Sequence, residues 1–191
     1  MNASIDISKV CLETNRLYLR AFQENDLEDF YSYASVPGVG ERAGWNHHTS
    51  REVTKEILNS FIKNKKTFAI VYKETNKVIG SLGIEFYDEE WVKDYDFSKG
   101  QGREIGYVLS KEYWGNGLMP EAVKAVLSYL FEEVELDFVL CSHSIDNLPS
   151  KRVQEKCGFT FIKEIIREVP VGKRISRLNI IRKEEYQNGK N

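Results

Sequence analysis

Two glycines, Gly115 and Gly117, lie between a segment with the features of a strand and a segment with helical spacing. Residues 104–109 are short, apolar and β-rich, which is typical of a mostly buried strand. Apolar residues in 119–134 recur on one helix face, with Pro120 in the first turn, where its missing N–H costs nothing. Glycines adopt backbone angles closed to other residues, so this loop can direct several N–H groups at one anion. The pattern predicts a phosphate or pyrophosphate site, with a simple tight turn as the alternative.

The two commonest phosphate motifs do not match this loop. A Walker A loop requires Lys-Ser/Thr after its last glycine, where this chain has Leu118 and Met119. A dinucleotide fingerprint requires Gly or Ala where Pro120 stands. Residues 38–43 match that fingerprint formally, but they follow Pro37 and no strand, so we interpret the match as coincidence. A nucleotide-binding module is therefore the less favoured hypothesis.

Two ordered segments resemble a known family. Glu-Ile-Gly-Tyr-Val-Leu at 104–109, followed by Tyr-Trp-Gly-Asn-Gly-Leu-Met-Pro-Glu-Ala at 113–122, resembles the acetyl-CoA-binding segment of the GCN5-related N-acetyltransferases (GNAT). The resemblance is strongest to the branch that includes the ribosomal-protein N-terminal acetyltransferases. A second match follows at 147–159, and the similarity extends over nearly the whole chain. It implies transfer of an acetyl group from acetyl-CoA to a primary amine, by direct attack in a ternary complex and without a metal.

The resemblance also implies which residues hold the cofactor. Loop N–H groups would bind the pyrophosphate, and the 104–109 strand would pair with the pantetheine arm. The N–H of Val108 is expected to polarise the thioester carbonyl. Asn147 is expected to contact the pantetheine arm, with a plain helix N-cap before Pro149 as the structural alternative. The expected cofactor-binding residues are Tyr107, Val108, Leu109, Trp114, Gly115, Asn116, Gly117, Leu118, Met119, Asn147 and Ser150.

The expected catalytic residues are Ser150, Glu104 and Glu85. Many relatives have a tyrosine acid where this chain has Gln154, so Ser150, a serine in this branch as well, is expected to protonate the departing thiolate. A neutral amine needs a base, for which Glu104 is the first candidate and Glu85 the second. Exposed strand-end acids are the structural alternative for both. The missing tyrosine also leaves open a non-catalytic acetyl-CoA-binding module.

The acceptor pocket is expected to involve Trp45, His48 and Glu85. Residues 44–50 resemble the loop that leads into the second helix of GNAT enzymes, and a locally bonded loop histidine is the alternative for His48. The three histidines lack the spacing of metal ligands, so no metal is expected. Residues 87–101 carry five acidic side chains and two lysines, with Trp91, Tyr95 and Phe97 interleaved. They are interpreted as a flap that attracts a cationic amine, or as a solvated loop or dimer contact. Protein N-termini, polyamines, amino acids and drugs all remain possible acceptors.

Composition limits the class of protein. With 191 residues, 41% of them hydrophobic, the chain is long enough for one well-buried core and short for two. A net charge of −2 argues against a protein that holds nucleic acid by its backbone. The chain lacks an apolar run that could span a bilayer and a signal-peptide core. Three scattered cysteines suit a reducing compartment, so we expect a soluble, cytoplasmic monomer or homodimer.

The order of elements predicts the fold class. Alternating or β-rich segments predict seven strands, and helical spacing predicts four helices. Strands first, followed by alternating strands and helices, are typical of a mixed α/β sheet with helices on both faces. The resemblance implies a twisted, mostly antiparallel sheet of about seven strands with one splayed pair. We expect a single acetyltransferase domain over 1–191, with 1–13 and 187–191 as flexible tails.

Overall fold

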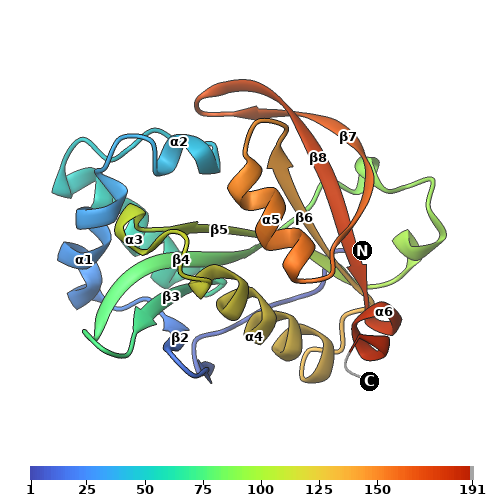
Figure 1. Ribbon diagram of the computed structural model, residues 1–191, viewed down its shortest axis with the longest axis horizontal. Coiled ribbons are helices and arrows are strands. Elements are labelled where there is room, and N and C mark those ends of the chain that lie inside the picture. The colour runs from blue at the N-terminus through green and yellow to red at the C-terminus, as the bar shows by residue number, and fades with distance from the viewer. Residues whose placement is uncertain (190–191) are drawn as a thin grey trace.

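The computed structural model describes residues 1–189 and contains an eight-stranded sheet with helices on both faces (Figure 1). The strand order is β1-β2-β3-β4-β5-β6-β8-β7, and only the β5–β6 pair is parallel. The strands are β1 (Cys11–Glu13), β2 (Leu17–Ala21), β3 (Thr67–Tyr72), β4 (Lys77–Glu85), β5 (Gly102–Leu109), β6 (Phe138–Ser144), β7 (Thr160–Val169) and β8 (Gly172–Arg182). The helices are α1 (Leu27–Ala34), α2 (Gly40–Ala43), α3 (Arg51–Asn64), α4 (Leu118–Glu132), α5 (Leu148–Lys156) and α6 (Lys183–Asn188). The mixed α/β class is confirmed, and the strand beyond the predicted seven is β1.

One face of the sheet is covered by α4 and α5, which lie in front of it in Figure 1. Helix α4 forms because its apolar residues recur every three or four positions, which gives it an apolar face that packs on the sheet. Its buried residues are Leu118, Met119, Ala122, Val123, Val126, Leu127, Tyr129, Leu130 and Phe131. Together with buried residues of β2 to β6 they form the largest apolar cluster. This packing fixes the start of α4, and thus the glycine loop, against the sheet.

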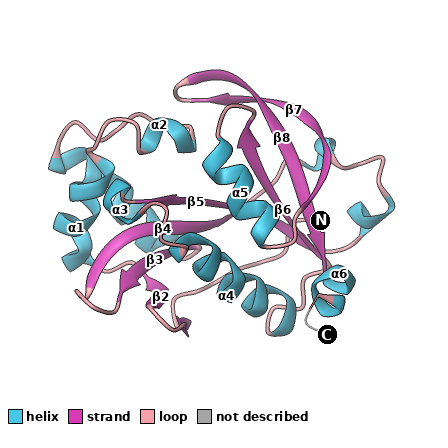
Figure 2. Cartoon of the chain, viewed as in Figure 1, coloured by secondary structure: helices cyan, strands magenta, loops and turns pink. Residues whose placement is uncertain are grey.

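The opposite face is covered in two separate parts. Helices α1 and α3 pack over β3 and β4, where Phe30 and Leu58 meet Ala69 and Val71. The long β4–β5 connection contains short helical turns and forms the lobe on the right in Figure 2. It packs over β6 and β8, where Tyr87, Val92, Phe138 and Leu178 belong to one apolar cluster. The segment that was interpreted as a flap is therefore anchored by buried side chains.

Strands β5 and β6 splay apart, as the family resemblance implied. Their pairing runs only from Gly102↔Phe138 to Ile105↔Cys141. Beyond this point β6 continues to pair with β8 as far as Ser144, and β5 continues to pair with β4 as far as Leu109. The second half of β5 therefore has one unpaired edge, which faces a gap in the sheet.

The N-terminal segment, for which we expected a flexible tail, lies against the sheet. Ala3 and Ile7 are buried, and the N–H of Ile7 donates to Lys65 O at 2.8 Å. Cys11–Glu13 then pairs with β2 as strand β1. At the other end, the expected tail 187–191 begins inside α6, and residues 190 and 191 lie outside the described residues.

Candidate functional site

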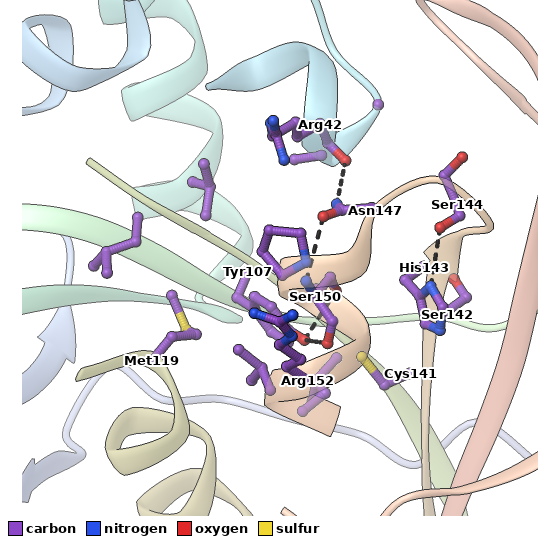
Figure 3. Close-up of a pocket in the computed structure, with 18 of the residues that line it drawn as sticks. Arg42, Tyr107, Met119, Cys141, Ser142, His143, Ser144, Asn147, Ser150 and Arg152 are labelled. Carbon is purple, nitrogen blue, oxygen red and sulfur yellow. Dashed lines mark hydrogen bonds between the residues drawn. The ribbon is translucent and has the colours of Figure 1, made fainter. Parts of the chain in front are cut away.

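A cavity of about 600 Å³ opens at the gap between β5 and β6. Its lining combines the glycine loop, the unpaired half of β5, the start of α5, the end of β6 and the β7–β8 hairpin. Figure 3 shows part of this lining, with Tyr107, Cys141 and Ser150 close together. Of the residues expected to bind a cofactor, only Asn116 does not line the cavity. The structure thus brings together residues that lie more than 40 positions apart in the sequence.

The glycine loop presents a row of unused N–H groups. Gly115 and Gly117 have φ angles of 80° and 75°, in the left-handed region that favours glycine. No oxygen atom within residues 1–189 accepts a hydrogen bond from the N–H groups of Gly115, Asn116, Gly117, Leu118 or Met119. These groups surround the N-terminus of α4, so the loop is suited to an anion.

Arg16 holds this loop from the β1–β2 side. Its Nη1 donates to Asn116 O at 3.0 Å, and its guanidinium pairs with Glu121 at 2.7 Å. Glu121 also accepts hydrogen bonds from Thr14 Oγ1 and from the Arg16 N–H. The Asn116 carbonyl is thereby held by Arg16, which leaves the loop N–H groups for a ligand. Sequence reasoning missed Arg16, because it lies about 100 residues from the loop.

The unpaired edge of β5 offers backbone groups from alternate residues. N–H directions alternate along a strand, and Ser110 donates its N–H to Ile79 O of β4 at 2.7 Å. The backbone of Val108, two residues earlier, therefore faces β4 as well. The N–H and C=O groups of Tyr107 and Leu109 face the gap. The geometry favours Tyr107 over Val108, the residue expected from the sequence, as the donor to a ligand in the gap.

Asn147 caps α5 and ties it to α2. Its Oδ1 accepts the N–H of Ser150 at 3.3 Å, and its Nδ2 donates to Arg42 O at 3.1 Å (Figure 3). The N-cap alternative is therefore satisfied in the structure, and Asn147 still lines the cavity. Arg42 itself stacks over Trp114 at 5.2 Å from the ring centroid. Helix α2 thus bridges the start of α5 and the glycine loop across the cavity.

Ser150 is held by side chains from two elements. Its Oγ lies 3.0 Å from the Tyr107 hydroxyl and accepts a hydrogen bond from Gln154 Nε2 at 3.3 Å. Gln154 in turn accepts from Asn179 Nδ2 at 2.6 Å. Burial raises the pKa of Tyr107 well above its ordinary value, so the phenol keeps its proton. From the sequence, Tyr107 was expected to act only through its backbone, and Gln154 was noted only because it replaces a tyrosine acid. The sequence did not show that both side chains position Ser150.

The two candidate carboxylates lie opposite each other on β4 and β5. Glu104 is buried, accepts a hydrogen bond from Ser142 Oγ at 2.6 Å and pairs with Arg167. Glu85 is more exposed and pairs with Lys66. Both line the cavity, and each has its own cation. Glu104 is therefore not the plain exposed acid of the structural alternative, whereas Glu85, with 42% of its side chain exposed at the end of β4, is close to it.

Trp45 and His48 lie in the apolar cluster beneath α1 and α3 and are not part of the cavity lining. The centroids of their rings are 5.1 Å apart, and His48 Nδ1 lies 2.9 Å from Thr54 Oγ1. Burial lowers the pKa of His48, which favours the neutral ring. This position fits the alternative of a locally bonded histidine.

Comparisons with known proteins identify the family of this chain. The acetyltransferase (GNAT) domain model matches residues 16–160. The chain belongs to the GNAT family. It is similar to the uncharacterized N-acetyltransferase p20 of Bacillus licheniformis, with 29% identity over 154 residues, covering 78% of this chain and 81% of that protein.

Solved structures share the GNAT fold of this chain. A GNAT-family acetyltransferase from Bacillus anthracis superposes with a TM-score of 0.78 at 23% identity, covering 92% of this chain and 99% of that one. RimL, a ribosomal L7/L12 alpha-N-protein acetyltransferase solved with coenzyme A, gives a TM-score of 0.72 at 15% identity, covering 91% of this chain and 98% of that one. The protein is thus a GNAT N-acetyltransferase.

GNAT enzymes use acetyl-CoA, and the residues of this cavity fit that cosubstrate. The glycine-loop N–H groups suit a pyrophosphate, and the open edge of β5 suits an arm that carries amides. Among residues 1–189, no group of three or more His, Cys, Asp or Glu side chains is arranged to hold a metal ion. No helix in this part of the chain is long and apolar enough to cross a membrane.

Proposed function

We propose that this GNAT enzyme transfers the acetyl group of acetyl-CoA to a primary amine, either a protein N-terminus or a small molecule, by direct attack in a ternary complex. The observation that carries the proposal is the gap between β5 and β6, where one cavity joins unused loop N–H groups, an open strand edge and the Ser150 hydroxyl. Acetyl-CoA supplies the activated acyl group, and the chain positions it and manages protons.

The alternation of β5 gives the two substrates different faces of the sheet. The Tyr107 side chain points to the α4 and α5 face, where its hydroxyl meets Ser150. Glu104 lies three residues before Tyr107 in the same strand, so its side chain points to the opposite face. There it contacts Ser142 and Arg167. In the proposal, the cofactor occupies the α4 and α5 face and the acceptor amine approaches from the other. The open N–H of Tyr107 would stabilise the oxyanion as the amine attacks.

Ser150 is proposed to donate a proton to the departing sulfur. Gln154 donates to its oxygen, and with the Tyr107 hydroxyl as a second donor the Ser150 proton would be directed into the cavity. Little acid strength is needed, since thiols titrate near pH 8.5. Glu104 is proposed to receive the amine proton, directly or through a water molecule, with Glu85 as the second candidate.

A thiol-release assay over a panel of peptide N-termini and small amines tests the proposal. We expect release of the CoA thiol that depends on both acetyl-CoA and the amine. Binding of acetyl-CoA without release for any amine would support the non-catalytic binding module instead. A larger thermal shift with ATP or NAD than with acetyl-CoA would support the nucleotide-binding module.

A further inference from the structure

Two arginines face each other across the β7–β8 hairpin at the acceptor side of the cavity. Arg167 and Arg174 are cross-strand partners, and both line the cavity. Like charges directly opposite each other destabilise a sheet pair, so this arrangement needs compensation. Ser176 and Ser144, which also line the cavity, are paired on the neighbouring strands. The arginines therefore extend the polar face that begins at Glu104 and Ser142.

Only one of the two arginines has a carboxylate partner. Arg167 pairs with Glu104, bonds Ser142 and stacks over Trp91 at 5.1 Å from the ring centroid. The Nη1 of Arg174 donates to the backbone oxygen of Glu41 at 2.6 Å. Within residues 1–189, no carboxylate lies within ion-pair distance of Arg174.

The remaining charges near Arg174 do not neutralise it. The pKa of Asp146 is lowered first by the hydrogen bond from Ser144, and Arg174 makes only a smaller contribution. Glu85 and Glu104 are each matched by a cation, Lys66 and Arg167. The acceptor side therefore has an excess positive charge at Arg174, with guanidinium N–H groups still available toward the cavity.

We propose that Arg174 binds a carboxylate carried by the acceptor, so that the preferred substrates are amines that bear a carboxylate and polyamines are disfavoured. The carboxylate can be that of an amino acid or that of an acidic side chain near a peptide N-terminus. An arginine fork suits a planar carboxylate, and an excess cation repels a second ammonium group. This inference rests on the proposed function and narrows its acceptor.

Matched substrate pairs test the inference in the thiol-release assay. One pair is serine against serinamide, and the other is a peptide with Glu against Gln at its second position. In the native enzyme, we expect kcat/KM for the acid of at least one pair to exceed that for its amide by about 10- to 100-fold, the range of a charge-assisted hydrogen bond. The pair that shows the difference identifies the source of the carboxylate.

Arg174→Gln should remove this preference. Its kcat/KM for the acid should fall to the level of the amide, mainly through KM, while the amide is turned over about as well as by the native enzyme. Lys173→Gln removes the same charge from the adjacent, exposed residue, which pairs with Glu168, and should keep the preference.

Two results would overturn the inference. One is an equal kcat/KM for acids and amides in the native enzyme. The other is an equal loss for both in Arg174→Gln, which would mean that Arg174 only fastens α2 through Glu41. If neither acids nor amides, nor any other amine, released thiol, the proposed function would fail and this inference with it.

Discussion

Gly117→Asp should abolish acetyl-CoA binding while the protein stays folded. An added Cβ at Gly117 meets only Arg16 Nη2, at 3.7 Å, so the substitution has room. The φ angle of 75° costs a non-glycine residue about 1–2 kcal/mol in stability. A carboxylate about 4 Å from one phosphate charge adds about 4 kcal/mol of repulsion at an effective dielectric constant of 20. Binding should therefore weaken by roughly 1000-fold.

Isothermal titration with acetyl-CoA and a thermal melt separate this effect from unfolding. Gly117→Ala carries the backbone strain without the charge and should keep most of the affinity. Gly172→Asp is the matched control, because it adds the same charge at a φ of 109° in the β7–β8 turn, where an added Cβ meets no atom within 4 Å. If Gly117→Asp binds acetyl-CoA as well as Gly172→Asp does, the glycine loop is not the phosphate site.

Three further perturbations test other parts of the site. Ser150→Ala should lower kcat for thiol release by about 100-fold, the lower end for general acids, with acetyl-CoA affinity nearly unchanged; an unchanged kcat would exclude Ser150 as the acid. Arg16→Ala should weaken acetyl-CoA binding about tenfold in titration, because the Asn116 carbonyl loses a charged donor. The pKa of His48 is lowered by burial below 6.5, so the unfolded chain binds more protons and the free energy of unfolding should fall as pH drops below 6.5. His48→Gln should flatten that slope in denaturant titrations.

Local signals in the sequence predicted the backbone of the glycine loop and the start of α4. Gly115 and Gly117 have left-handed backbone angles, as their residue type predicts. Helix α4 starts within one residue of the position predicted from its apolar spacing and from Pro120 in its first turn. Gly158, just after α5, has a φ of 86°, which is typical of a glycine that follows the end of a helix. Strand β1 was missed because its three residues are too few to show alternation.

The other half of the cavity, the proposed acceptor side, depends on contacts between residues that lie far apart in the sequence. Arg167 lies 63 residues from Glu104, and a register shift between Phe161 and Lys163 breaks the alternation of β7. A prediction that assumes strict alternation along β7 therefore assigns the residues beyond this shift to the wrong face of the sheet. The β4–β5 connection was interpreted as a flap that attracts a cationic amine, or as a solvated loop or dimer contact, yet Trp91 stacks on Arg167 and Val92 is buried. Its interleaved apolar residues were the signal for packing.

In the proposed function, the regular alternation of β5 lets one strand contact both substrates. Its register with β4 runs without a shift from Glu104 to Leu109, so Glu104 and Tyr107 must point to opposite faces. The pairing with β6 ends between these two residues, at Ile105, and the cavity at the resulting gap is lined by both of them. A one-residue insertion between Glu104 and Tyr107 that keeps Tyr107 to Leu109 in register with β4 would turn the Glu104 carboxylate away from Ser142 and Arg167 while leaving the glycine loop in place. Cofactor binding should then survive, because the glycine loop keeps its position. Acetyl transfer should be lost, because Glu104 and Tyr107 would no longer point to opposite faces of the sheet.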